Sequence, residues 1–133
     1  MKKYFVIYLL ALVTMLLACK GKQPEPGYKN ISLANLKEDV IGKDVQFVDV
    51  RTAIEYKSGH IDDAVNMNIL NKKKFKEQTE VLDKTKPVYV YCMSGKRSYH
   101  ASKLFQSLGF KTIYDYSGGW SEWSKKLDEK SEK

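Results

Sequence analysis

Cys92 begins a short segment whose residue types suit a reactive thiol. The cysteine follows the apolar run Val88 to Tyr91 and precedes a helical pattern from Tyr99 to Leu108, so it is predicted to lie in a strand-to-helix loop. In open α/β sheets ligands bind at this edge, where backbone N–H groups and the helix dipole favour an anion such as a thiolate. The loop continues with Met93, Ser94, Gly95, Lys96, Arg97 and Ser98.

The composition of this loop favours chemistry over simple packing. A cysteine at the end of a strand is often a small and inert core residue. Such a residue does not need Gly95, which lets the loop curl so that its amides face inward, or the positive charges of Lys96 and Arg97. The loop therefore predicts a cysteine nucleophile that acts on an anionic molecule.

Strands and helices alternate around the loop, which predicts βαβ units and a parallel sheet. Further strands are expected at 45–50, 65–69 and 112–114, with 31–33 as an edge strand. Helical spacing predicts helices over 33–40, 75–82 and 120–127, and Gly109 stands where a helix C-cap is expected.

Several sequence blocks in one order resemble the rhodanese family of single-domain sulfurtransferases. The blocks are Phe47 to Arg51, Glu55-Tyr56, Gly59 to Ile61, Ala64 to Met67, Cys92 to Arg97, Leu108 to Phe110 and Tyr116 to Trp120. The resemblance implies a single α/β domain over residues 30–127, built as a doubly wound parallel sheet with helices on both faces. One departure is Asp62-Asp63, where the family commonly has Pro-Gly.

The resemblance also implies sulfane-sulfur transfer through a Cys92 persulfide. Thiosulfate or a similar small sulfur anion is the expected donor, and cyanide or a thiol is the expected acceptor. Arg97 is our candidate for gripping the donor, Lys96 adds positive field, and Met93 lines the loop together with Gly95. Ser94 and Ser98 are candidates to hydrogen-bond the persulfide, although Ser98 also fits the N-cap of the next helix.

The family places the block Asp49-x-Arg51 close to the active loop. We interpret these residues as supporting, with Arg51 paired to a carboxylate such as Glu55.

Three alternatives remain open on sequence. A phosphatase or arsenate reductase also combines a cysteine with a cationic loop, but its loop has one more residue between cysteine and arginine than the four found here. A non-catalytic binding module is a second alternative, although this chain keeps the cysteine, glycine and arginine. A carrier that passes its persulfide sulfur to a partner protein is the third.

The N-terminus predicts export and lipid attachment. Lys2 and Lys3 precede an apolar stretch from Tyr4 to Leu17, shorter than the roughly 20 residues of a membrane-spanning helix. The stretch ends in Leu-Leu-Ala-Cys, which matches the bacterial lipobox. We therefore expect a signal peptide over 1–18, a lipid on Cys19, a flexible tether over 19–29, and the domain on the extracytoplasmic side of a membrane in the cell envelope.

The remaining features bound the function further. The net charge of +7 falls to +5 once Lys2 and Lys3 are removed, and no basic and aromatic recognition module points to nucleic acid. No His, Cys and carboxylate cluster has metal-ligand spacing, so we expect no metal and no cofactor. A charged tail is expected over 128–133, and a monomer is the expected state.

Overall fold

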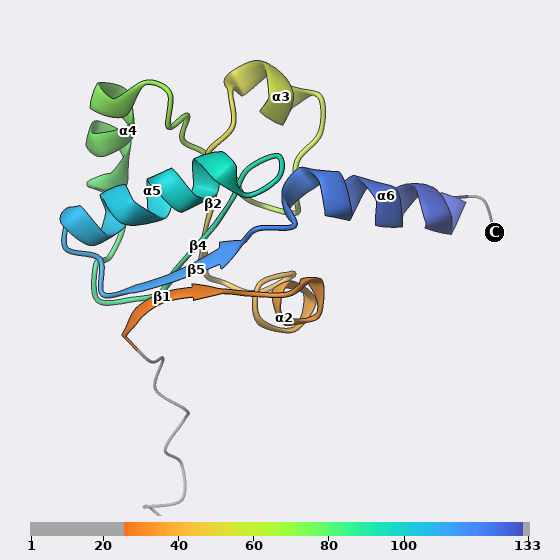
Figure 1. The fold of residues 1–133 in the computed structure, drawn as a ribbon, viewed down its shortest axis with the longest axis horizontal. Helices are drawn as coiled ribbons and strands as arrows, with labels where there is room; N and C mark the ends of the chain where they lie inside the picture. Colours follow the sequence, from red (N-terminus) through yellow and green to blue (C-terminus); the bar gives the residue numbers. More distant parts are fainter. Residues whose placement is uncertain (1–25, 132–133) are drawn as a thin grey trace, which may run out of the picture.

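The computed structural model describes residues 26–131, with side chains as far as Asp128. Over these described residues, five strands alternate with five helices. Figure 1 shows how they are arranged. In chain order they are β1 (Gly27–Asn30), α2 (Leu33–Asp39), β2 (Gln46–Asp49), α3 (Ala53–Lys57), β3 (Val65–Asn66), α4 (Lys72–Thr79), β4 (Val88–Tyr91), α5 (Lys96–Ser107), β5 (Thr112–Tyr116) and α6 (Gly119–Ser131).

The strands form one parallel sheet in the order β1-β5-β4-β2-β3. β4 lies at its centre, paired with β5 on one side and β2 on the other. Asp49 at the end of β2 is in register with Tyr91, the residue before Cys92. The carboxyl ends of these strands therefore meet at one edge, where the predicted loop emerges from the sheet.

The sheet has a hydrophobic core on each of its two faces. Side chains alternate along each strand, so Val88, Val90 and Cys92 join Phe75 of α4 and Phe105 of α5 on one face. Tyr91 and Tyr116 point to the opposite face, with Leu36 of α2 and with Trp120 and Trp123 of α6. Helices thus cover both faces, which confirms the predicted doubly wound architecture.

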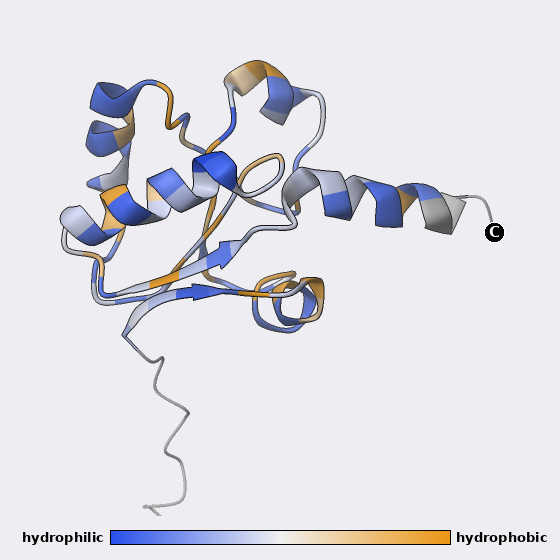
Figure 2. Ribbon diagram, in the orientation of Figure 1, coloured by the Kyte–Doolittle hydropathy of each residue, from blue (hydrophilic) through white to orange (hydrophobic). Residues whose placement is uncertain are grey.

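Helix α4 is predominantly hydrophilic. Figure 2 shows hydrophilic residues over most of it, and it carries four lysines in eight residues. Phe75 and Thr79 are the buried residues of α4, Gln78 is half-buried, and the other residues of the helix are exposed. Phe75 packs this lysine-rich helix against the core.

Several predicted boundaries differ from the observed ones because local caps decide where helices begin. The edge strand expected at 31–33 lies at 27–30, since Ser32 caps α2 and Leu33 is its first helical residue. Residues 27–29 therefore pair in the sheet instead of belonging to the tether predicted over 19–29. Asn71 caps α4, which begins before the predicted Phe75.

Other elements also differ in extent. β3 is limited to Val65–Asn66, shorter than the strand expected over 65–69, and β5 extends beyond the predicted end at Tyr114. Helix α3 was not predicted. α6 continues to Ser131, into the segment expected to be a charged tail. The C-cap expected at Gly109 is matched by its φ of +93°, just after α5.

At the family departure, Asp62 adopts φ +48° and its carboxylate accepts a hydrogen bond from Gly42 N (2.9 Å). An aspartate tolerates this left-handed conformation, which a proline at the same position cannot adopt because its ring fixes φ near −65°. The local turn therefore differs from the one that Pro-Gly would form.

The predicted signal peptide (1–18) and Cys19 lie outside the described residues. Over residues 26–131, no helix combines the length and the apolar character that crossing a bilayer requires.

Candidate active site

Cys92 directly follows β4 and lies in a short loop that ends where α5 begins. Its side chain is 1% exposed and is a free thiol. Gly95 N donates a hydrogen bond to Cys92 Sγ (3.1 Å), and the thiol donates to Ser98 Oγ (3.6 Å). Gly95 is the N-cap residue of α5 and has φ +99°, a conformation that favours glycine. The loop therefore aims a backbone amide at the sulfur from the positive end of a twelve-residue helix.

The turn between β5 and α6 holds this loop through its backbone carbonyl groups. Trp120 N donates to Cys92 O (2.9 Å) and Ser121 N donates to Met93 O (3.0 Å). A Cβ atom on Gly119 would lie 2.5 Å from Cys92 O and 2.6 Å from Met93 O, so only glycine allows this approach. The first amides of α6 thereby hold the carbonyl groups of Cys92 and Met93, while the amide of Gly95 faces the sulfur.

Arg97 is paired with Glu55 of α3. Its Nη1 and Nη2 donate to the two carboxylate oxygens of Glu55 at 2.8 and 2.7 Å. The hydrogen bonds from Arg97, against the opposing effect of partial burial, lower the pKa of Glu55 to about 2. Arg97 is therefore paired with a carboxylate in this structure, and its role in gripping the anionic donor stays a prediction.

Asp49 and Arg51 form a buried pair beside the loop. Arg51 Nη2 donates to Asp49 Oδ2 and to Gly59 O, both at 2.7 Å, and Tyr91 Oη donates to Asp49 Oδ2 (2.6 Å). The guanidinium carbon lies 5.0 Å from the ring centre of Trp120. The expected pairing of Arg51 with Glu55 is therefore wrong. Asp49, at the end of β2, is the carboxylate that pairs with Arg51. Glu55 lies on α3 and pairs with Arg97 instead.

Ser98 lies in the first turn of α5 and is not its N-cap. Its hydroxyl donates to Gly95 O (3.1 Å) while accepting from the thiol of Cys92. The carboxyl of Asp115, in β5, accepts a hydrogen bond from Tyr28 Oη at Oδ2 (3.0 Å), whereas its buried Oδ1 has no hydrogen-bond partner among the described residues. Burial raises the pKa of Asp115, and the hydrogen bond from Tyr28 opposes this only in part.

The other predicted loop residues occupy different environments. Ser94 and Lys96 are exposed, and Met93 is half-buried. The sequence reasoning missed Glu55 as the partner of Arg97, although Thr52 and Glu55 form an S/T-x-x-E capping box that marks the start of a helix. It also missed Asp115, because a single acidic residue in a predicted apolar strand only weakly indicates a position near the site. No group of three potential metal ligands occurs among residues 26–131.

Comparison with known proteins identifies the family. The family model of the rhodanese-like domain matches residues 32–126, so the chain belongs to the rhodanese-like domain family. It is 34% identical over 96 residues to thiosulfate sulfurtransferase GlpE of Shewanella oneidensis, covering 72% of this chain and 92% of that protein. GlpE of Coxiella burnetii (strain RSA 331) is 35% identical over 96 residues, covering 72% of this chain and 87% of that protein.

A solved structure agrees with these relatives. A rhodanese-related protein from Thermoplasma volcanium superposes with a TM-score of 0.63 at 30% identity, covering 74% of this chain and 93% of that one. Together these similarities support a rhodanese-type sulfurtransferase.

Proposed function

We propose that this protein transfers a sulfane sulfur from thiosulfate or a similar anion to a thiol or cyanide, with Cys92 as the carrier. The observation that carries the proposal is the hydrogen bond from Gly95 N to Cys92 Sγ (3.1 Å) at the N-terminus of α5. This arrangement favours a negatively charged sulfur, either as thiolate or as persulfide. The relatives named thiosulfate sulfurtransferase support the same chemistry.

The reaction consists of two displacements. The Cys92 thiolate attacks the outer sulfur of thiosulfate, the sulfur–sulfur bond of the donor breaks, and sulfite leaves with the bonding electron pair. Cys92 then carries one extra sulfur as a persulfide anion. An acceptor thiolate or cyanide attacks this outer sulfur, and the Cys92 thiolate leaves, which regenerates the enzyme. Such a sequence predicts ping-pong kinetics.

The loop and the residues around it suit the binding of a single transferred sulfur atom better than the binding of a phosphate group. Four residues separate Cys92 from Arg97, and the Arg97 guanidinium is held by Glu55. A phosphatase needs a loop that surrounds a tetrahedral oxyanion with donors. Here the thiol of Cys92 is in contact with Ser98, whose hydroxyl can rotate to donate to a persulfide.

Peptide mass spectrometry of the full-length protein tests the proposal. The protein is treated with thiosulfate, digested without reductant, and the peptide that contains Cys92 is weighed. We expect a gain of one sulfur atom that is discharged by cyanide. The gain disappears in Cys92→Ser and persists in Cys19→Ser, which removes the other cysteine of the chain. Absence of the gain with thiosulfate, mercaptopyruvate and polysulfide refutes the proposal.

We also propose that Cys19 is lipid-modified and anchors the domain outside the cytoplasm. The support is the sequence alone: the basic start, the apolar stretch and the terminal Leu-Leu-Ala-Cys. Bacteria that express the protein with a labelled fatty acid should incorporate the label, and Cys19→Ser should abolish it. A labelled Cys19→Ser protein, or an unlabelled natural sequence in the membrane fraction, contradicts the anchor.

A further inference from the structure

A groove lies between α4 and α5 and reaches the active loop at Arg97. Its volume is about 650 Å³, within the range of sites that hold small organic molecules. The buried side chain of Ile69 and the half-buried side chain of Leu104 contribute apolar surface. From Arg97 to Leu104 the groove follows about two turns of α5, or roughly 10 Å.

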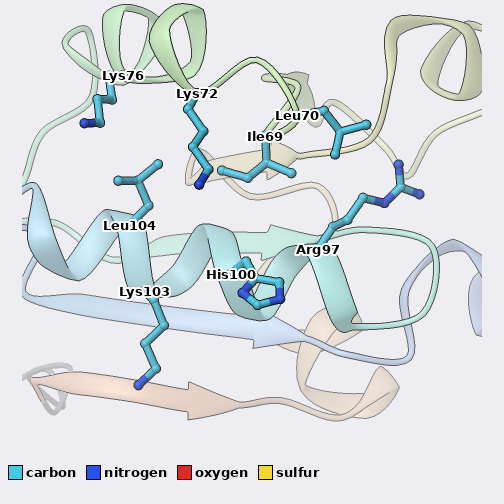
Figure 3. A pocket seen from close by; sticks show the side chains of 8 residues that line it. All are labelled: Ile69, Leu70, Lys72, Lys76, Arg97, His100, Lys103 and Leu104. Carbon is cyan, nitrogen blue, oxygen red and sulfur yellow. The ribbon is translucent and has the colours of Figure 1, made fainter.

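The charges along the groove are positive. Lys72 and Lys76 line it from α4, one turn apart, and His100 lines it from α5 (Figure 3). No aspartate or glutamate is among the described residues that line the groove. Arg97 adds little free charge because Glu55 pairs with its guanidinium.

Lys103 also lines the groove, but its ammonium group has other contacts. Lys103 Nζ lies 5.7 Å from the ring centre of Tyr28 and 5.3 Å from that of Tyr99, and Figure 3 shows the side chain directed toward β1. These aromatic rings hold the charge of Lys103 on the far side of α5. The free positive charge of the groove is therefore that of Lys72 and Lys76.

We propose that this groove binds the sulfur acceptor, and that the acceptor is a small thiol carrying one or more carboxylates. The proposal rests on the proposed function, because only a persulfide on Cys92 gives such a thiol a reaction. The apolar walls suit the carbon skeleton of the thiol, and Lys72 and Lys76 suit its carboxylates. One end of the groove is lined by Arg97, the first-turn residue of α5 that follows the loop from Cys92, so a thiol bound there would lie beside the active loop.

The acceptor half-reaction tests the groove. Full-length protein in non-ionic detergent is loaded with thiosulfate, and its discharge is followed with mercaptosuccinate and with neutral 2-mercaptoethanol. The variant Lys72→Glu/Lys76→Glu is compared with Lys73→Glu/Lys74→Glu, which makes the same charge change on exposed residues of the same helix that do not line the groove. Because each thiol is compared with itself across variants, its intrinsic reactivity cancels.

We expect the groove variant to slow discharge by mercaptosuccinate about tenfold, and the control variant to slow it less than about threefold. Discharge by 2-mercaptoethanol should change by less than about twofold in both. Equal slowing in the two variants would mean that only overall charge matters and would overturn the proposal, as would an unchanged rate in the groove variant.

A binding measurement separates this proposal from the sulfurtransferase function. S-methylmercaptosuccinate has the carboxylates but cannot accept sulfur, and its binding is followed by the amide NMR signals of α4 and α5. Binding that is lost in Lys72→Glu/Lys76→Glu supports the groove even if no persulfide forms, in which case the proposed function alone fails. Sulfur loading without any binding of this probe overturns the groove and leaves the proposed function intact.

Discussion

Replacing Arg51 with methionine should destabilise the protein far more than replacing Arg97, although each arginine lies 2.7 Å from its carboxylate. The difference follows from burial. The side chains of Arg51 and Asp49 are 1% and 0% exposed, so Arg51→Met leaves the Asp49 carboxylate buried with the Tyr91 hydroxyl and one backbone amide as partners. Removing one member of a buried pair costs about 3–5 kcal/mol.

The Arg97–Glu55 pair is worth less because water screens it. The lowering of the Glu55 pKa from 4.5 to about 2 would correspond to about 3 kcal/mol if it were unscreened. The two side chains are 25% and 28% exposed, and pairs in contact with water contribute about 1 kcal/mol or less. We therefore expect Arg97→Met to cost about 1 kcal/mol.

Urea unfolding at neutral pH measures both variants, and methionine keeps the length of the arginine stem in each. Asp49→Asn in the Arg51→Met background should recover part of the loss, because the uncompensated charge is then gone. If Arg51→Met unfolds the protein outright, Arg51→Lys provides the intermediate case, since it keeps the charge and loses the two-pronged geometry. Equal losses for Arg51→Met and Arg97→Met, or no recovery by Asp49→Asn, would refute the reasoning.

Three further predictions concern the loop and the acidic residues near it. Gly119→Ala should slow sulfur loading about tenfold or more in the mass-spectrometric assay, because the added Cβ would contact the loop carbonyls. The control Gly42→Ala should load normally, since Gly42 has φ +70° but open space around it, and the substitution strains only the backbone. The free energy of unfolding should fall as pH drops from about 4.5 to about 2, since the pKa of Glu55 is lowered in the folded state; Glu55→Gln should flatten this slope in urea titrations. Stability should also fall as pH rises above 3.8 through the raised pKa of Asp115, and an unchanged slope in Asp115→Asn would contradict that assignment.

The alternation of apolar strands with amphipathic helices was sufficient to predict the parallel sheet and its two covered faces. The position of Cys92 between β4 and α5 followed from the same pattern, because a strand buried on both faces reads as a continuous apolar run. Helix starts were less predictable. Caps at Ser32 and Asn71 depend on single polar residues, whose signal is weaker than the periodicity of a helix.

The sequence by itself determined the chemistry of the site: a cysteine, a glycine and two cations in one short loop, with the order of blocks that marks the family. Only the tertiary structure decided how the charges pair. Glu55 and Arg97 are 42 residues apart in sequence and meet because α3 and α5 lie at the same edge of the sheet. Spacing along the chain cannot indicate which carboxylate reaches which guanidinium, since that depends on side-chain directions and burial after the helices have packed.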